Sequence, residues 1–126
     1  MSRENDLSKL IIGAAIEVHR ALGPGLLESA YEECLCFELS QLDLSFERQV
    51  PLPVRYKSVN LDGGYRLDVV VEKCVVIELK TVEALAAIHD AQLLTYLKIS
   101  QLRLGILLNF NSPTLKEGLK PIVNRL

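Results

Sequence analysis

The sequence predicts an α/β fold in which helices cover both faces of a mixed sheet. Two segments, Tyr65–Val71 and Cys74–Lys80, are rich in β-branched residues and apolar at most positions, which is typical of strands buried on both sides. Segments with apolar residues at helical spacing come before and after them. Because both faces of these strands are apolar, we expect helices on both sides of the sheet.

Turn residues and spacing place the other elements in the order α-α-β-β-β-α-β. A first helix, capped by Asn5 or Asp6, should end at Gly23-Pro24-Gly25, because glycine followed by proline stops a helix. A second helix is expected from about Leu26 to Leu42, and a third from about Val82 to Ser100. The inner stripe of the second helix is expected to contain Leu27, Tyr31, Cys34, Leu35, Leu39 and Leu42. The remaining strands are expected at Arg103–Phe110 and in one stretch with two segments, Ser45–Val50 and Val54–Tyr56, which Pro51 and Pro53 confine to an edge or a break. A last short strand could follow near Ile122.

The connection between the two buried strands can be predicted from residue parity. Asp68 and Glu78 lie on the same face of the sheet only if opposed residues have an even sum, since side chains alternate along a strand. A plain two-residue loop at Glu72-Lys73 would make that sum odd. The hairpin therefore needs a three-residue connection or a bulge. With it, Asp68, Val70, Val76, Glu78 and Lys80 would share one face, and Val69, Val71, Val75, Ile77 and Leu79 the other.

Composition indicates a single globular domain over residues 1–126. Hydrophobic residues make up 49% of the chain and charged residues 24%, an ordinary balance for a folded domain. The net charge of −2 counts mildly against a nucleic-acid binder, although basic residues could gather on one face. Cys34, Cys36 and Cys74 lack metal-ligand spacing and are expected to be reduced thiols. No signal peptide or membrane span is visible, so we expect a cytoplasmic protein without a membrane partner.

Asp68, Glu78 and Lys80 are charged residues within otherwise apolar strand segments, where burying a charge is costly. Mg²⁺ prefers oxygen ligands and typically binds through one or two carboxylates. Asp68 and Glu78 could supply them, and the carbonyl of Leu79 could add a ligand. Lys80 could hold the attacking water or neutralise charge on a phosphate. The alternative is a salt bridge facing solvent at the end of the sheet.

Two helical groups could complete such a site. Glu28 shares a helix face with Tyr31 and could be a third acidic ligand, directly or through water; alternatively, it only complements the helix dipole. On the third helix, His89, Gln92 and Tyr96 lie on one stripe. Gln92 and Tyr96 could contact phosphate or the lysine, or the stripe could be a polar seam beside the sheet.

Several motifs in this order resemble the GxxExxY proteins of the PD-(D/E)XK nuclease superfamily, which has the restriction-endonuclease-like fold. The resemblance runs from about Leu10 to Phe110. It rests on Gly25-Leu26-Leu27-Glu28-Ser29-Ala30-Tyr31, Tyr65-Arg66-Leu67-Asp68, Ile77-Glu78-Leu79-Lys80, His89-Asp90-Ala91-Gln92-Leu93-Leu94-Thr95-Tyr96-Leu97 and Leu107-Leu108-Asn109-Phe110.

The resemblance implies a fold and a set of roles. The fold is an αβββαβ core, with a mixed four-stranded sheet flanked by helices and one extra N-terminal helix. Asp68 and Glu78 resemble the metal carboxylates, Lys80 the catalytic lysine and Glu28 the acid of the first motif. The residues Gln92 and Tyr96 resemble the QxxxY motif of RecB-type exonucleases. The proline that the superfamily names before its aspartate is replaced by Leu67, which removes no ligand.

Three functions follow from these observations. The leading hypothesis is a Mg²⁺- or Mn²⁺-dependent nuclease that hydrolyses phosphodiester bonds of DNA or RNA. The second is a catalytically inactive module on a nuclease fold that binds protein or nucleic acid. The third is a metal-dependent hydrolase acting on another phosphorylated substrate. A small single site cuts one strand, so duplex cleavage would favour a homodimer or a protein partner.

Overall fold

The computed structural model describes residues 2–61 and 63–125 and contains a five-stranded sheet between two helical layers. Its elements are α1 (Arg3–Leu22), α2 (Glu28–Gln41), β1 (Phe46–Pro51), β2 (Val54–Tyr56), β3 (Val59–Leu61), β4 (Arg66–Val71), β5 (Val75–Lys80), α3 (Ala87–Ser100), β6 (Leu104–Asn109), a 3₁₀ turn η1 (Leu115–Gly118) and β7 (Leu119–Val123).

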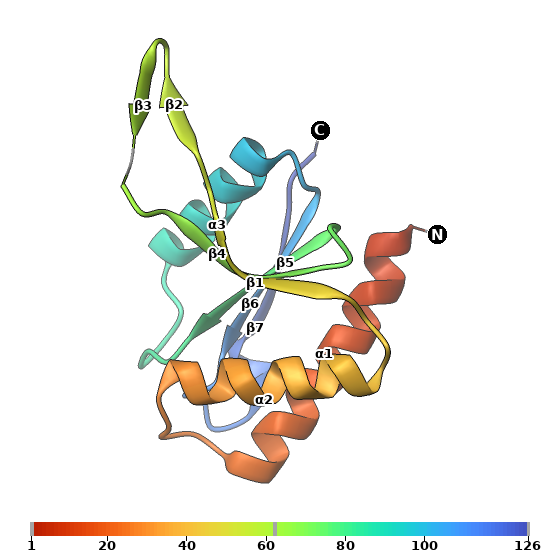
Figure 1. Ribbon diagram of the computed structural model, residues 1–126. Helices are drawn as coiled ribbons and strands as arrows, with labels where there is room; N and C mark the ends of the chain where they lie inside the picture. Colours follow the sequence, from red (N-terminus) through yellow and green to blue (C-terminus); the bar gives the residue numbers. More distant parts are fainter. Residues whose placement is uncertain (1, 62, 126) are drawn as a thin grey trace.

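The sheet is mixed and has the strand order β1-β4-β5-β6-β7. Only β5 and β6 are parallel, and α3 provides the crossover between them. The resemblance implies four strands in this sheet; the short last strand expected near Ile122 is β7, which adds a fifth by pairing with β6. Strands β2 and β3 form a separate antiparallel hairpin that projects beyond the sheet (Figure 1). The sequence did not predict the strand β3, which pairs with β2.

Helices cover both faces of the sheet, as the sequence predicts (Figure 1). Helices α1 and α2 pack on one face, over a core that includes Val69, Val71, Val75, Ile77 and Leu79. Helix α3 packs on the other face, over Val70, Val76, Leu93, Leu97 and Leu107. None of the helices in the described part of the chain is long and apolar enough to cross a membrane.

The β4–β5 connection confirms the parity argument. Val71 pairs with Val75 and Val69 with Ile77, so opposed residues have an even sum and three residues form the loop. Glu72 and Lys73 both have a φ of 53°, and the N–H of Cys74 donates to the carbonyl of Val71. Continuing this register places Asp68 opposite Glu78.

The predicted division of side chains between the two faces fails at one end of β4. Leu67 packs in the same cluster as Val70, although side chains an odd number of residues apart should lie on opposite faces. The alternation is therefore interrupted around Asp68. The side chain of Asp68 therefore need not point to the face that a regular strand would give it.

Helix boundaries differ from the predicted ones where side chains from elsewhere intervene. Ser2, rather than Asn5 or Asp6, caps α1: its hydroxyl accepts from the N–H of Asn5. Helix α3 begins at Ala87 and not near Val82, because the buried Asn109 side chain binds both the N–H and the carbonyl of Val82. In α2, Leu27 and Leu42 are exposed and do not belong to the inner stripe.

Candidate active site

Asp68 and Glu78 approach each other where the pairing of β4 with β5 stops. The last ladder pair is Val69 with Ile77. Beyond it, the N–H of Asp68 donates to Oε1 of Glu78 at 3.1 Å, and the N–H of Leu79 donates to Oδ2 of Asp68 at 2.9 Å. Each carboxylate therefore binds a backbone N–H of the opposite strand. These two bonds hold the predicted pair of acids together.

Burial and mutual repulsion make the charged form of this pair unfavourable. The Glu78 side chain is buried; desolvation first, and then the charge of Asp68, raise its pKa to about 8. Desolvation also raises the pKa of Asp68, and the hydrogen bond from Leu79 opposes that shift. Two desolvated carboxylates at one point form a site that a cation would stabilise.

Lys80 and Glu28 lie beside the pair. Lys80 is half-buried at the end of β5, and its positive charge opposes the rise in the pKa of Glu28, Asp68 and Glu78. Glu28 is exposed in the first turn of α2; partial desolvation of its carboxyl and the charge of Asp68 raise its pKa. Among residues 2–61 and 63–125, no group of three or more acidic, histidine or cysteine side chains is arranged to hold a metal.

Helix α3 contributes Tyr96 and Gln92 from the other side of the sheet. The amide of Gln92 donates to the Tyr96 hydroxyl at 3.1 Å. Desolvation, followed by the charge of Glu78, raises the pKa of Tyr96, so this hydroxyl lies within electrostatic range of the acids. His89 of the same stripe has a structural role: its Nδ1 accepts from the N–H of Ala86 at the start of the helix.

Tyr31, three residues after Glu28 in the same motif, is fully buried and structural. Its hydroxyl donates to the carbonyl of Gly23 at 2.6 Å and accepts from the N–H of Leu26 at 3.1 Å. Its ring stacks on Phe110, with centroids 4.6 Å apart. The tyrosine therefore fixes the loop that leads into α2, and this loop determines where Glu28 lies.

Replacing Tyr31 with phenylalanine should lower the free energy of unfolding by about 1 to 2 kcal/mol, because two backbone groups lose their partner. Urea unfolding measures this change. The Tyr56→Phe variant, whose side chain is exposed on the hairpin, is the control and should be unchanged. Equal stability of the two variants would contradict the structural role of Tyr31.

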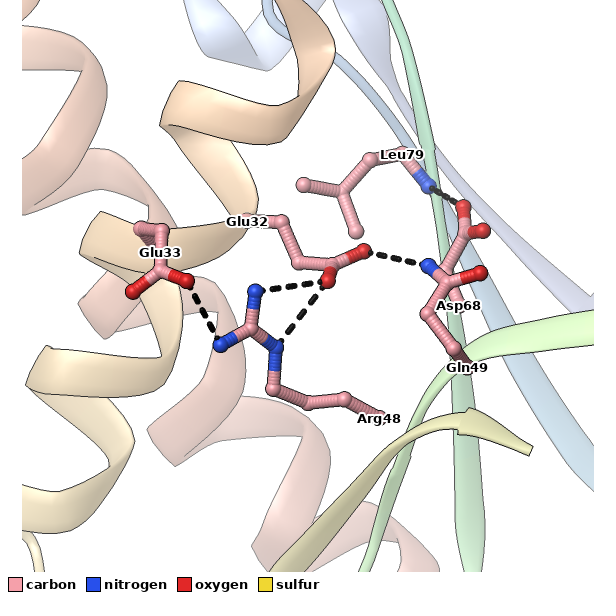
Figure 2. Close-up of polar contacts among 6 residues, drawn as sticks. All are labelled: Glu32, Glu33, Arg48, Gln49, Asp68 and Leu79. Atoms are coloured by element: carbon pink, nitrogen blue, oxygen red, sulfur yellow. Dashed lines mark hydrogen bonds and ion pairs between the residues drawn. The ribbon is translucent and has the colours of Figure 1, made fainter.

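A buried acid that sequence reasoning missed lies next to the pair. Glu32 on α2 is buried and accepts from Nε and Nη2 of Arg48 at 3.0 and 2.9 Å. The amide of Gln49 donates to its other oxygen at 2.8 Å (Figure 2). Glu32 is three residues before Leu35, in the buried stripe of the helix, and an acid in that position is the signal that could have found it. Gln49 carries no comparable signal.

Asp68 and Glu78 suit a divalent cation. They provide the hard oxygen ligands that Mg²⁺ and Mn²⁺ take, in the number that Mg²⁺ typically uses. A cation beside them would also offset the repulsion that raises both pKa values. The donor set thus fits the metal that the sequence predicts.

Comparison with known proteins gives a match to a protein family. The family model described as the PD-(D/E)XK nuclease superfamily matches residues 5–122. No curated protein and no solved structure matches the chain. The match does not reach the level of the GxxExxY branch, which stays a prediction from the motif around Glu28. With nearly the whole chain matched and a mixed sheet flanked by helices, this protein belongs to the PD-(D/E)XK nuclease superfamily.

Proposed function

We propose that the chain is a metal-dependent nuclease that hydrolyses phosphodiester bonds of DNA or RNA. The observation that supports it best is the convergence of Asp68 and Glu78, with Lys80 two residues further along β5. The match of residues 5–122 to a nuclease superfamily supports the same reaction class. The three free cysteines agree with the cytoplasmic location that we propose for it.

In this proposal Asp68 and Glu78 hold Mg²⁺ or Mn²⁺, with the carbonyl of Leu79 as a further ligand. Glu28 is exposed and therefore contributes through water. When bound, a divalent cation supplies Lewis-acid polarisation of a phosphate oxygen. The backbone bonds that fix one oxygen of each carboxylate orient the pair before any ligand arrives.

Lys80 and the α3 residues act on the substrate. The ammonium of Lys80 orients the attacking water or stabilises negative charge that develops on the phosphate. Tyr96 and Gln92, already hydrogen-bonded to each other, orient the substrate from the α3 side of the acids. A chain with one site of this kind cuts one strand at a time, so cleavage of both strands of a duplex would require a second copy or a protein partner.

Replacing Lys80 with methionine should reduce cleavage at least about a hundredfold, because the aliphatic stem remains while the charge is lost. Single- and double-stranded DNA and RNA are incubated with the protein and Mn²⁺, and the products are separated on a gel. Lys9→Met, an exposed lysine of α1, is the control and should cleave like the wild type. Wild-type cleavage by Lys80→Met would exclude the role given to Lys80.

A second candidate is a catalytically inactive module that binds protein or nucleic acid. The net charge of −2 favours it, because phosphate affinity depends largely on basic surface. The same experiment distinguishes the two: Mn²⁺ binding by the wild type without cleavage of any of the four nucleic acids would support the module. Hydrolysis of another phosphorylated substrate would instead support a different metal-dependent hydrolase.

A further inference from the structure

Gln49 has a left-handed backbone in the middle of strand β1. Its φ is 50°, a conformation disfavoured for residues other than glycine. Arg48 pairs with Val69 and Val50 with Leu67, so the register is the same before and after Gln49. Gln49 therefore stands opposite Asp68 without pairing to it, and no residue is inserted. The distortion is confined to the residue that faces the first metal carboxylate.

This backbone conformation brings two consecutive side chains to one acid. In a regular strand, Arg48 and Gln49 would point to opposite faces. Both nevertheless bind Glu32, through Nε and Nη2 of Arg48 and through Nε2 of Gln49 (Figure 2). The left-handed φ of Gln49 turns its side chain toward α2. The backbone carbonyl of Gln49 accepts a hydrogen bond from the side chain of Arg66.

The hydrogen bond to Glu32 fixes the orientation of the Gln49 side-chain amide. A carboxylate only accepts hydrogen bonds, so the NH₂ group of Gln49 must face Glu32. Arg48 holds Glu32 from the other side and is itself held by Glu33 at 2.8 Å. An NH₂ group has two hydrogens. One binds Glu32. Asp68 stands opposite Gln49 across the β1–β4 pairing, and hydrogen bonding from the Gln49 side chain opposes the rise in the pKa of its carboxyl.

We propose that Gln49 is a positioning residue of the active site: its amide joins the buried Glu32–Arg48 pair to Asp68 and holds the Asp68 carboxylate in its metal-binding orientation. The proposal rests on the function proposed above, in which Asp68 is a metal ligand. Asp68 needs such a contact because its own strand is irregular: the alternation of β4 breaks there and the pairing with β5 has stopped. Strained backbone conformations cluster at functional sites, where they help to hold the site in its working arrangement.

Replacing Gln49 with glycine separates positioning from folding. Glycine adopts a φ of 50° without strain, and this gain offsets part of the stability lost when the buried Glu32 carboxylate loses the Gln49 amide, so the variant should remain folded. The amide is lost, so the affinity for Mn²⁺ should fall about ten- to hundredfold, as when outer partners of metal ligands are removed. Gln49→Asn, which also tolerates this backbone but is one methylene too short to reach both acids, should lose affinity in the same way. Isothermal titration with MnCl₂ and thermal unfolding give the two measurements.

Gln101 provides a matched control. It is an exposed glutamine with a φ of 61°, at the C-terminus of α3, so Gln101→Gly relieves the same kind of strain outside the network. This variant should bind Mn²⁺ like the wild type. Unchanged Mn²⁺ affinity in Gln49→Gly or Gln49→Asn, with a wild type that binds, would overturn the role of Gln49 alone. A wild type that does not bind Mn²⁺ would overturn the proposed function, and the positioning role with it.

Discussion

Replacing Glu78 with glutamine is expected to abolish divalent metal binding and cleavage while the fold remains intact. The amide has the size of the carboxylate, and its oxygen can still accept the N–H of Asp68 that Glu78 binds. What disappears is one of the two anionic ligands of the proposed metal site. Removing a residue that hydrogen-bonds a metal ligand already lowers metal affinity about ten- to a hundredfold. Removing a ligand itself should therefore weaken Mn²⁺ binding by at least about a hundredfold.

Titration with MnCl₂ and a cleavage assay measure the two effects, and Asp68→Asn should reproduce both. Glu47→Gln on β1 is the matched control, because Glu47 is exposed and has no role in the site. The control should bind and cleave like the wild type. Wild-type Mn²⁺ affinity in Glu78→Gln would exclude Glu78 as a ligand, and with it the assignment of the site.

The metal-free protein should lose stability as the pH rises from about 4.5 to about 8. The pKa of Glu78 is raised from its ordinary value of 4.5 to about 8. In this window the unfolded chain has lost the Glu78 proton while the folded chain keeps it, so each rise in pH favours unfolding. One such proton gives a slope of at most about 1.4 kcal/mol per pH unit. Asp68, whose pKa is also raised, contributes with the same sign.

Urea unfolding in the presence of EDTA, from about pH 5 to about pH 9, tests this expectation. The informative quantity is the free energy of unfolding of the wild type minus that of Glu78→Gln, because the variant lacks this proton and other groups cancel. The difference should fall with pH and level off above about 8. At that pH and without EDTA, free Mn²⁺ at a hundred times its dissociation constant should restore about 2.7 kcal/mol to the wild type. A difference that is flat or rises with pH would contradict the raised pKa of Glu78.

The hairpin between β4 and β5 was predictable because its constraints are local. Strands alternate with a period of two, and the apolar face must remain buried, so the number of residues between Asp68 and Glu78 fixes the parity of the loop. The structure has the three-residue connection that this argument requires. Helix α1 ends where Gly23 and Pro24 stop it, for an equally local reason.

Other features depend on residues distant in the chain and could not be predicted in this way. The side chain of Asn109 holds the main chain at Val82 and delays the start of α3. Leu27 has the spacing of a core residue but is exposed, because the loop anchored by the Tyr31 hydroxyl turns it away from the sheet. Periodicity reports that a residue is apolar and does not report which surface is free to receive it.

For the candidate site, too, some features could be predicted from the sequence and others depend on the tertiary structure. The sequence by itself determined the acids and the lysine, Asp68, Glu78 and Lys80, because charge inside a buried strand is costly and therefore conspicuous. Only the tertiary structure decided that backbone N–H groups across a broken ladder hold the acids, and that a contact between Glu32 and Gln49 lies beside Asp68. The physical reason is that Glu32 and Gln49 come from a helix and an edge strand. Their contact depends on how α2 packs against the sheet and on one left-handed φ, which no local pattern in the chain encodes.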